Sequence, residues 1–147
     1  MVRQRVALIP ASYLLLMEDN ELLMMKRQNT GYMDGKWSVP AGHVEDHEKP
    51  TTAMIRETEE EIGIKIEPED LKFALVNHRR AEEGSHDRVD YYFHCTRYSG
   101  TVKNREPEKC AELSWFPLDE LPNETIPTVA HAVAIFRRQQ QFSDQEV

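Results

Sequence analysis

The chain has 147 residues, of which 39% are hydrophobic, and this is enough apolar material for the core of one domain over residues 1–147. Its 18 basic and 26 acidic residues give a net charge of −8, which argues against polymeric nucleic acid as a partner, because a phosphate backbone is held by positive surface. No apolar run approaches the length of a membrane-spanning helix, and residues 1–10 lack the apolar region of a signal peptide. We therefore expect a cytoplasmic protein without a membrane partner, whose two cysteines are reduced thiols.

The first part of the chain alternates apolar runs with turn-forming residues. Residues 5–17 are rich in Val, Leu and Ile and predict a strand covered on both faces. A turn at residues 18–21 leads to a returning strand at 22–27. Asn29 and two glycines then indicate a loop, which ends in a short extended piece at residues 37–40.

The last part of the chain predicts three more strands and a closing helix. We expect strands at residues 71–79, 88–97 and 111–116, an amphipathic helix at 126–141, and frayed residues at 144–147. The helix should bury one stripe of its surface: Val129, Ala132, Val133 and Phe136. Strands and helices in this order predict a layered α/β fold.

The segment between these parts, residues 42–64, contains a dense group of acidic residues. Read as a helix, it brings Glu57, Glu60 and Glu61 within an arc of about 100° on one face, and Gly63 is a natural terminator. Arg56 lies four residues before Glu60 and can reach it. Like charges at this spacing destabilise a helix, and Mg²⁺ or Mn²⁺ would offset that effect because both prefer clustered carboxylate oxygens. The alternative from helix geometry alone is a solvated acidic face.

The spacing of the whole segment favours the metal site. Written as a pattern it is G-x5-E-x7-R-E-T-x-E-E-x-G-I, beginning at Gly42 and ending at Ile64. This resembles the signature of the Nudix hydrolases, from which only Thr58 departs, since it stands where the family has a bulky aliphatic residue. The resemblance implies an α/β/α sandwich in which a mixed β-sheet lies between helices.

The resemblance also implies roles for individual residues. The carbonyl of Ala41, just before the first glycine of the pattern, would join the metal shell, and Arg56 would orient a glutamate. Glu48 either ligates metal or pairs with Arg56. Glu106 stands where MutT-like members carry a further carboxylate, with Glu108 and Glu112 as alternatives. The full set comprises catalytic residues Arg56, Glu57 and Glu60, metal ligands Ala41, Glu57, Glu60, Glu61 and Glu106, and substrate-binding residues Arg27 and Tyr32.

Arg27 would contact phosphates and Tyr32 would stack on a base. A surface role for Arg27 is the alternative, and Lys36, Arg79, Arg80 and Arg88 are further candidates for the phosphate contact.

The implied chemistry is Mg²⁺-dependent hydrolysis of a nucleoside diphosphate linked to another group, with Mn²⁺ as a substitute and Glu57 as the general base. The motifs that mark ADP-ribose, dinucleoside polyphosphate and NADH hydrolases are missing, so the sequence looks like a MutT-like nucleoside triphosphate pyrophosphohydrolase. The alternatives are a hydrolase of another nucleotide derivative, such as a nucleotide sugar, and a non-catalytic module that senses a nucleotide. The partner is then a small nucleotide, and the sequence leaves the oligomeric state open, with a homodimer as one alternative.

Overall fold

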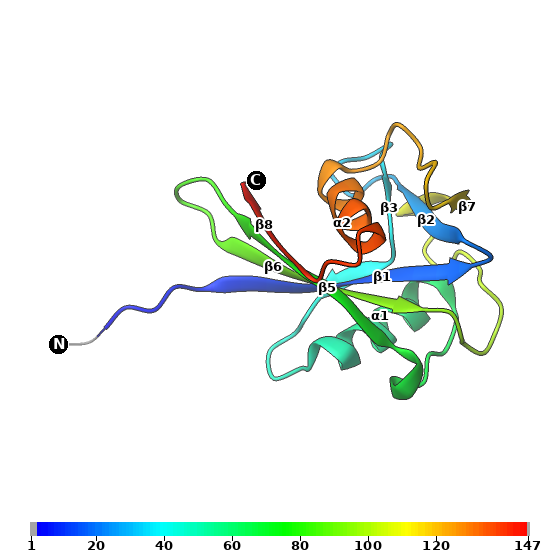
Figure 1. The fold of residues 1–147 in the computed structure, drawn as a ribbon, viewed down its shortest axis with the longest axis horizontal. Coiled ribbons are helices and arrows are strands. Elements are labelled where there is room, and N and C mark those ends of the chain that lie inside the picture. The colour runs from blue at the N-terminus through cyan, green and yellow to red at the C-terminus, as the bar shows by residue number, and fades with distance from the viewer. Residues whose placement is uncertain (1–2, 147) are drawn as a thin grey trace.

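The sheet is organised around β1 (Leu8–Glu18), which pairs with three other strands in the computed structural model, whose described part is residues 3–146 (Figure 1). One edge of β1 pairs in parallel with β6 (Asp87–Cys95). The other edge changes partner part-way along. Residues 11–13 pair antiparallel with β4 (Ala41–His43), whereas residues 17 and 18 pair with β2 (Glu21–Arg27). The sheet therefore divides into two branches at β1.

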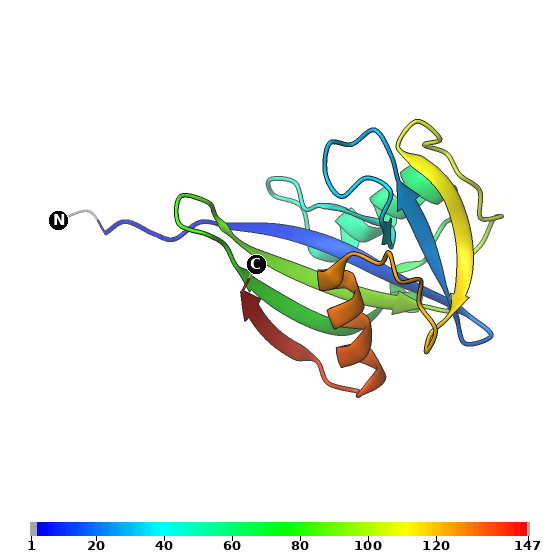
Figure 2. The ribbon, with the colours of Figure 1, turned by 90° about the horizontal axis from the view of Figure 1, so that it is seen from above.

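Each branch is completed by strands that are distant in sequence. β2 pairs antiparallel with β3 (Trp37–Ser38) and, along its whole length, with β7 (Cys110–Pro117). On the other branch, β5 (Lys72–Arg80) lies antiparallel to β6 and carries β8 (Phe142–Glu146) in parallel on its outer edge, as Figure 2 shows. Parallel and antiparallel pairs thus occur in one eight-stranded sheet.

Two helices cover opposite faces of this mixed sheet, α1 (Pro50–Ile62) on one and α2 (Pro127–Arg137) on the other (Figure 1). The apolar run in β1 explains the arrangement, because successive side chains point to opposite faces. Leu15 packs in the core that contains the α2 residues, whereas Leu14 and Leu16 pack in the core under α1. The expected α/β/α sandwich is confirmed. No helix within residues 3–146 has the length and apolar character that a membrane crossing requires.

The end of the chain differs from the prediction. The helix expected at 126–141 ends at Arg137, because Gln139 adopts a positive φ of 58° and is followed by two polar residues with nothing to bury. The expected fraying is wrong for residues 144–146, which belong to β8 and pair with β5, while residue 147 lies outside the described part. Val129, Ala132 and Val133 are buried as predicted, and the fourth buried position on α2 is Ile135 instead of Phe136, which is only half-buried.

The start of the first strand was also predicted wrongly. Residues 5–7 lie outside β1, and Val6 is 84% exposed. The reason is the length of the partner: β6 begins at Asp87, which pairs with Leu8, so the residues before Leu8 have no strand to pair with.

Two buried side-chain polar atoms within residues 3–146 lack a hydrogen-bond partner, Asn77 Oδ1 and the Tyr92 hydroxyl, and the second of them gives a test of the packing. Tyr92 is fully buried in the core beneath α2, and within residues 3–146 its hydroxyl has no hydrogen-bond partner. Because a buried unsatisfied hydroxyl destabilises the folded state, Tyr92→Phe is expected to raise the free energy of unfolding by about 1 kcal/mol. Urea denaturation measures the change. The matched control is Tyr98→Phe, whose hydroxyl donates to Glu18 at 3.0 Å near the surface; a loss of stability in Tyr92→Phe would contradict the packing described here.

Candidate active site

The acidic helix α1 is fixed at both ends. Pro50 occupies its first turn, where a missing N–H costs nothing, and its carbonyl accepts a hydrogen bond of 2.8 Å from Ser12 Oγ on β1. At the other end Gly63 adopts a left-handed φ of 73° and its N–H donates to the carbonyl of Glu59. The predicted terminator is confirmed, and the helix is anchored to the central strand of the sheet.

Thr58, the departure from the family pattern, lies where an aliphatic side chain was expected to face the sheet. It is fully buried, and its hydroxyl donates to the carbonyl of Met54 at 2.7 Å. Because the polar atom is satisfied within the helix, threonine fits this apolar position.

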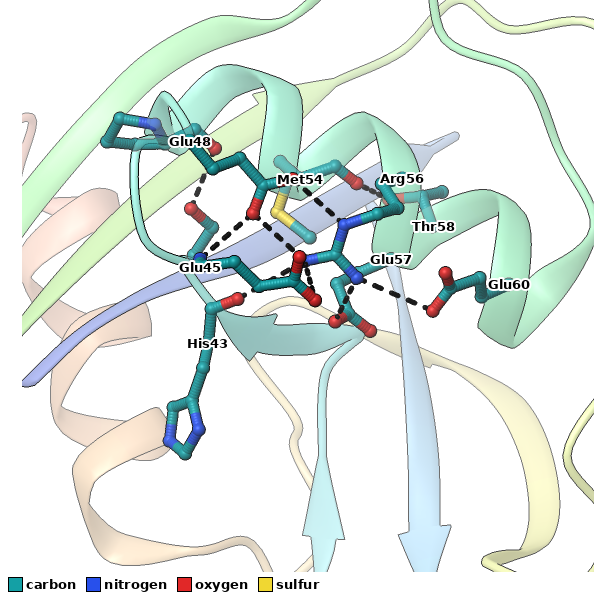
Figure 3. Close-up of polar contacts among 10 residues, drawn as sticks. His43, Glu45, Glu48, Met54, Arg56, Glu57, Thr58 and Glu60 are labelled. Carbon is teal, nitrogen blue, oxygen red and sulfur yellow. Dashed lines mark hydrogen bonds and ion pairs between the residues drawn. The ribbon is translucent and has the colours of Figure 1, made fainter.

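Arg56 joins the loop before the helix to the helix itself (Figure 3). Its Nε and Nη2 donate to the two carboxylate oxygens of Glu48 at 2.9 and 3.0 Å, and its Nη1 donates to Glu57 Oε1 at 2.8 Å. Glu45 and Glu60 lie at 3.6 Å from the same guanidinium. Of the two roles considered for Glu48, the structure supports pairing with Arg56.

The electrostatic consequence appears in the pKa values of this pair. Hydrogen bonds from Arg56, and then one from the Glu45 N–H, lower the pKa of the Glu48 carboxyl to about 2. The bond to Glu48 likewise raises the pKa of the Arg56 guanidinium, although desolvation opposes the shift. Both groups are therefore charged across the physiological range.

Glu57 lies against the backbone of β4. A Cβ atom at Gly42 would overlap the side chain of Glu57, so only glycine allows the carboxylate to lie there. The same strand begins at Ala41, whose backbone lowers the pKa of Glu61 and so opposes part of the effect of burial. The carboxylates of α1 therefore lie over β4, the strand that contains Gly42, which is the first residue of the family pattern.

Glu106 reaches this group from a distant loop. The loop runs beside the end of α1, where the Arg105 N–H donates to the carbonyl of Glu61 at 3.0 Å. Asn104 shapes the loop, since its side chain accepts from the Glu106 N–H and donates to the carbonyl of Cys110. Burial, followed by the negative charges of Glu57 and Glu106, raises the pKa of Glu61 well above its ordinary value. Four carboxylates, those of Glu57, Glu60, Glu61 and Glu106, therefore line one region of the site, and the raised pKa of Glu61 reflects their repulsion.

These carboxylates line a cavity of about 1230 Å³ between the two branches of the sheet. Arg27 and Tyr32 lie on its rim. Arg27 donates to the Tyr32 carbonyl at 2.8 Å and to Thr30 Oγ1 at 3.0 Å, and its guanidinium lies 5.5 Å from the centre of the Tyr32 ring, which is 52% exposed. The cavity is large enough for a nucleotide, since small-molecule sites usually measure about 300–1,000 Å³.

The comparisons with known proteins agree with this geometry. A model of the NUDIX domain matches residues 8–138. The chain belongs to the NUDIX domain family.

Three relatives of this Nudix domain extend the comparison. The MutT-like protein of Streptomyces ambofaciens is 34% identical over 104 residues, which cover 71% of this chain and 60% of that protein. The 8-oxo-dGTP diphosphatase of Buchnera aphidicola subsp. Schizaphis graminum is 26% identical over 115 residues, which cover 78% and 81% of the two chains. The crystal structure of a MutT NUDIX hydrolase from Burkholderia pseudomallei has a TM-score of 0.78 at 26% identity and covers 87% of this chain and 97% of that one.

The cavity of the Nudix domain brings together all of the predicted site residues except Arg56, which lies behind Glu57 and holds it. Of the other basic residues considered, Arg79 and Arg88 line the cavity, whereas Lys36 and Arg80 do not. Sequence reasoning missed Tyr13 and Lys109, which also line it. No motif marks these two, because strand alternation and a loop bring them to the site.

The donor set fits a hard divalent cation. Among residues 3–146, no three acidic, histidine or cysteine side chains form a ready-made metal cage, and Arg56 draws Glu57 towards itself. A cage is not required, because Mg²⁺ usually keeps several waters and binds one or two carboxylates. The residues that would hold the ion are Ala41, Glu57, Glu60, Glu61 and Glu106.

The clamp between Glu48 and Arg56 predicts a pH dependence of stability. The pKa of Glu48 is about 2 in the folded protein, below its ordinary value of 4.5, so the unfolded chain binds the proton first as the pH falls. The stabilisation is complete above about pH 4.5 and is lost as the pH falls towards 2. Glu48→Gln is therefore expected to lower stability at pH 6 and to make it less dependent on pH between 5 and 3.

Urea unfolding at several pH values measures this effect, with Glu59→Gln as the control because the Glu59 side chain is exposed on α1 and takes no part in the clamp. Parallel pH profiles for the wild type and Glu48→Gln would contradict the role of the clamp.

Proposed function

We propose that this Nudix domain hydrolyses a nucleoside diphosphate linked to another group, and that its substrate is a nucleoside triphosphate cleaved to a nucleoside monophosphate and pyrophosphate. The observation that carries the proposal is the group of four glutamates on one wall of a nucleotide-sized cavity, Glu57, Glu60, Glu61 and Glu106. The MutT-like protein and the 8-oxo-dGTP diphosphatase among its relatives support the same class of substrate.

The need for a cation follows from the charges. A polyphosphate is anionic and is repelled by a wall of glutamates, so the two bind together only when positive charge lies between them. Magnesium or manganese, when bound, would neutralise phosphate oxygens and lower the pKa of a bound water. The chain supplies the oxygen ligands that such an ion prefers.

The protein's own part in the reaction is to orient groups and to accept a proton. Arg56 is a positioning residue, since its hydrogen bond to Glu57 Oε1 fixes that carboxylate against β4. The other oxygen of Glu57 can take a proton from the attacking water, and Glu57 is our candidate for the general base. Glu60 is more exposed, with 53% of its side chain accessible, and is suited to an ion that arrives with the substrate.

Other residues that line the cavity suit the rest of the nucleotide. Lys109 and Arg27 offer positive charge for the outer phosphates. The exposed ring of Tyr32, which already lies over Arg27, offers a surface on which a base can stack.

The product distinguishes this reaction from other phosphatase activities. With Mg²⁺ and a panel of nucleoside triphosphates, the protein is expected to release pyrophosphate, and a chelator is expected to abolish release. Glu60→Gln keeps the shape of the side chain and removes its charge, so kcat should fall by about 10²-fold or more, the scale seen when one electrostatic element of an active site is lost.

The matched control for Glu60→Gln is Glu59→Gln on the exposed side of α1, which should keep normal turnover. Release of orthophosphate as the first product would contradict the proposed cleavage position, and normal turnover in Glu60→Gln would remove Glu60 from the site.

Glu106 gives a separate test, because it reaches the site from outside the family pattern. Glu106→Gln removes a charge beside Glu61 and is expected to lower kcat and to raise the Mg²⁺ concentration required for the half-maximal rate. Glu108→Gln is the control, since Glu108 is exposed two residues away and does not line the cavity. Identical Mg²⁺ titrations for the two variants would confine the metal ligands to α1 and Ala41.

A further inference from the structure

Apart from two residues of the loop that carries Tyr32, the exposed large apolar side chains of the described residues lie at two places on the sheet. Val6 and Leu8 are 84% and 45% exposed where the chain enters β1. Phe73 on β5 and Phe142 on β8 are 44% and 63% exposed, at the end of the other branch. Single exposed apolar residues are common on protein surfaces, so the backbone and the charges at each place decide what they indicate.

The first place is an extended segment without a partner strand. Residues 3–7, which we call the arm, precede β1, and within residues 3–146 no strand pairs with them. The arm leads away from the body of the molecule in both views (Figures 1 and 2), and all five of its residues are exposed. It carries two basic residues, Arg3 and Arg5, in a chain whose net charge is −8. The arm is therefore a positively charged segment whose backbone is available for pairing.

The second place is the outer edge of β8. This strand is the last of its branch, and no strand of residues 3–146 pairs with its outer edge. Ser143 and Gln145 face α2 and hydrogen-bond to it, whereas Phe142, Asp144 and Glu146 are exposed. An open edge is a template for another strand, and like charges prevent two such edges from pairing with each other. The edge of β8 therefore selects a strand of opposite charge.

The arm meets this requirement in spacing as well as in sign. Arg3 and Arg5 are two residues apart, as are Asp144 and Glu146, so each pair lies on one side of an extended backbone. In a parallel or an antiparallel ladder of suitable register, the two arginines stand opposite the two carboxylates, where opposite charges stabilise a sheet. Glu146 also pairs with Arg80 at 3.0 Å, in an exposed contact that the arm would share.

The β8 edge of the same chain is not accessible to the arm. Two strands, β6 and β5, lie between β1 and β8, so the edge is three strand spacings, or about 14 Å, from β1. Five extended residues span about 17 Å at most, and an arm that crossed this distance would have no length left for pairing. The β8 edge of a second copy imposes no such limit.

We propose that the arm of one chain pairs as an additional strand with the β8 edge of a second copy, and that the exchange is reciprocal in a two-fold dimer. Reciprocal exchange uses both arms and both edges, so the assembly closes, whereas one-way pairing leaves an arm and an edge exposed and continues into longer chains. The dimer is independent of the proposed hydrolysis, since neither the arm nor β8 lines the cavity.

Sedimentation equilibrium of the full chain tests the proposal. The mass should rise from that of a monomer towards that of a dimer as the concentration increases, and it should fall again with added salt, because exposed charge pairs are screened. The arm variant Arg3→Glu/Arg5→Glu and the edge variant Asp144→Lys/Glu146→Lys each place like charges opposite one another. The dissociation constant of each variant is expected to rise by roughly 10- to 100-fold.

An equimolar mixture of the two variants is the sharpest measurement. The reversed arm of one variant faces the reversed edge of the other, and the unchanged arm faces the unchanged edge, so the mixture should recover the wild-type dissociation constant to within about threefold. The matched control is Arg137→Glu/Arg138→Glu, which makes the same change in net charge as the arm variant at exposed positions by the end of α2. This control should dimerise like the wild type.

A wild-type chain that stays monomeric at its highest soluble concentration would overturn the proposal. The same holds for an arm variant that dimerises like the wild type, and for a mixture of the two folded variants that remains monomeric. The arm lies outside every helix and strand, so its variant is expected to fold, and it decides the question even if the edge variant does not.

Discussion

The acidic site depends on one cation, Arg56. Its planar guanidinium binds both oxygens of Glu48 and still reaches Glu57, with Glu45 and Glu60 at 3.6 Å. A lysine could not make these bonds at once, because an ammonium group has no fork that matches two carboxylate oxygens. Arg56 and Glu48 are largely shielded, with 26% and 12% of their side chains exposed, so the pair is stronger than a typical surface ion pair. The clamp fixes the loop before α1 to the helix, and it holds negative charge near the cavity in the absence of a ligand.

The cavity itself is a consequence of how β1 pairs. Because β1 changes partner between β4 and β2, the two branches diverge, and the space between them is lined from both sides. The carboxylates of α1 reach that space past β4 because Gly42 has no side chain to obstruct Glu57. The sequence pattern that begins at this glycine thus describes a packing requirement as well as a set of ligands.

The difference between local rules and tertiary contacts explains which parts of the fold and of the site the sequence could predict. The strand at Leu14, Leu15 and Leu16 and the end of α1 at Gly63 follow from local rules, namely side-chain alternation and the left-handed region of glycine. β8 could not be predicted in this way, because its five residues carry little apolar pattern and are ordered by pairing with β5. The approach of Glu106 to Glu61 depends on two hydrogen bonds of Asn104, and the contact between Arg79 and Asp90 depends on strand register. Such contacts are tertiary, and residue spacing does not encode them.

An acidic chain can nevertheless hold an anionic ligand, and the cavity lining explains how. The whole chain carries a net charge of −8, but the lining contains five acidic and five basic residues and is formally neutral. Most of the acidic and basic residues come from different elements. Three of the acidic residues come from α1, whereas four of the basic residues come from strands: Lys26 and Arg27 on β2, Arg79 on β5 and Arg88 on β6. Since local fields decide where an anion binds, phosphates bridged by cations can lie against the helix while the strands provide donors for the remainder of the nucleotide.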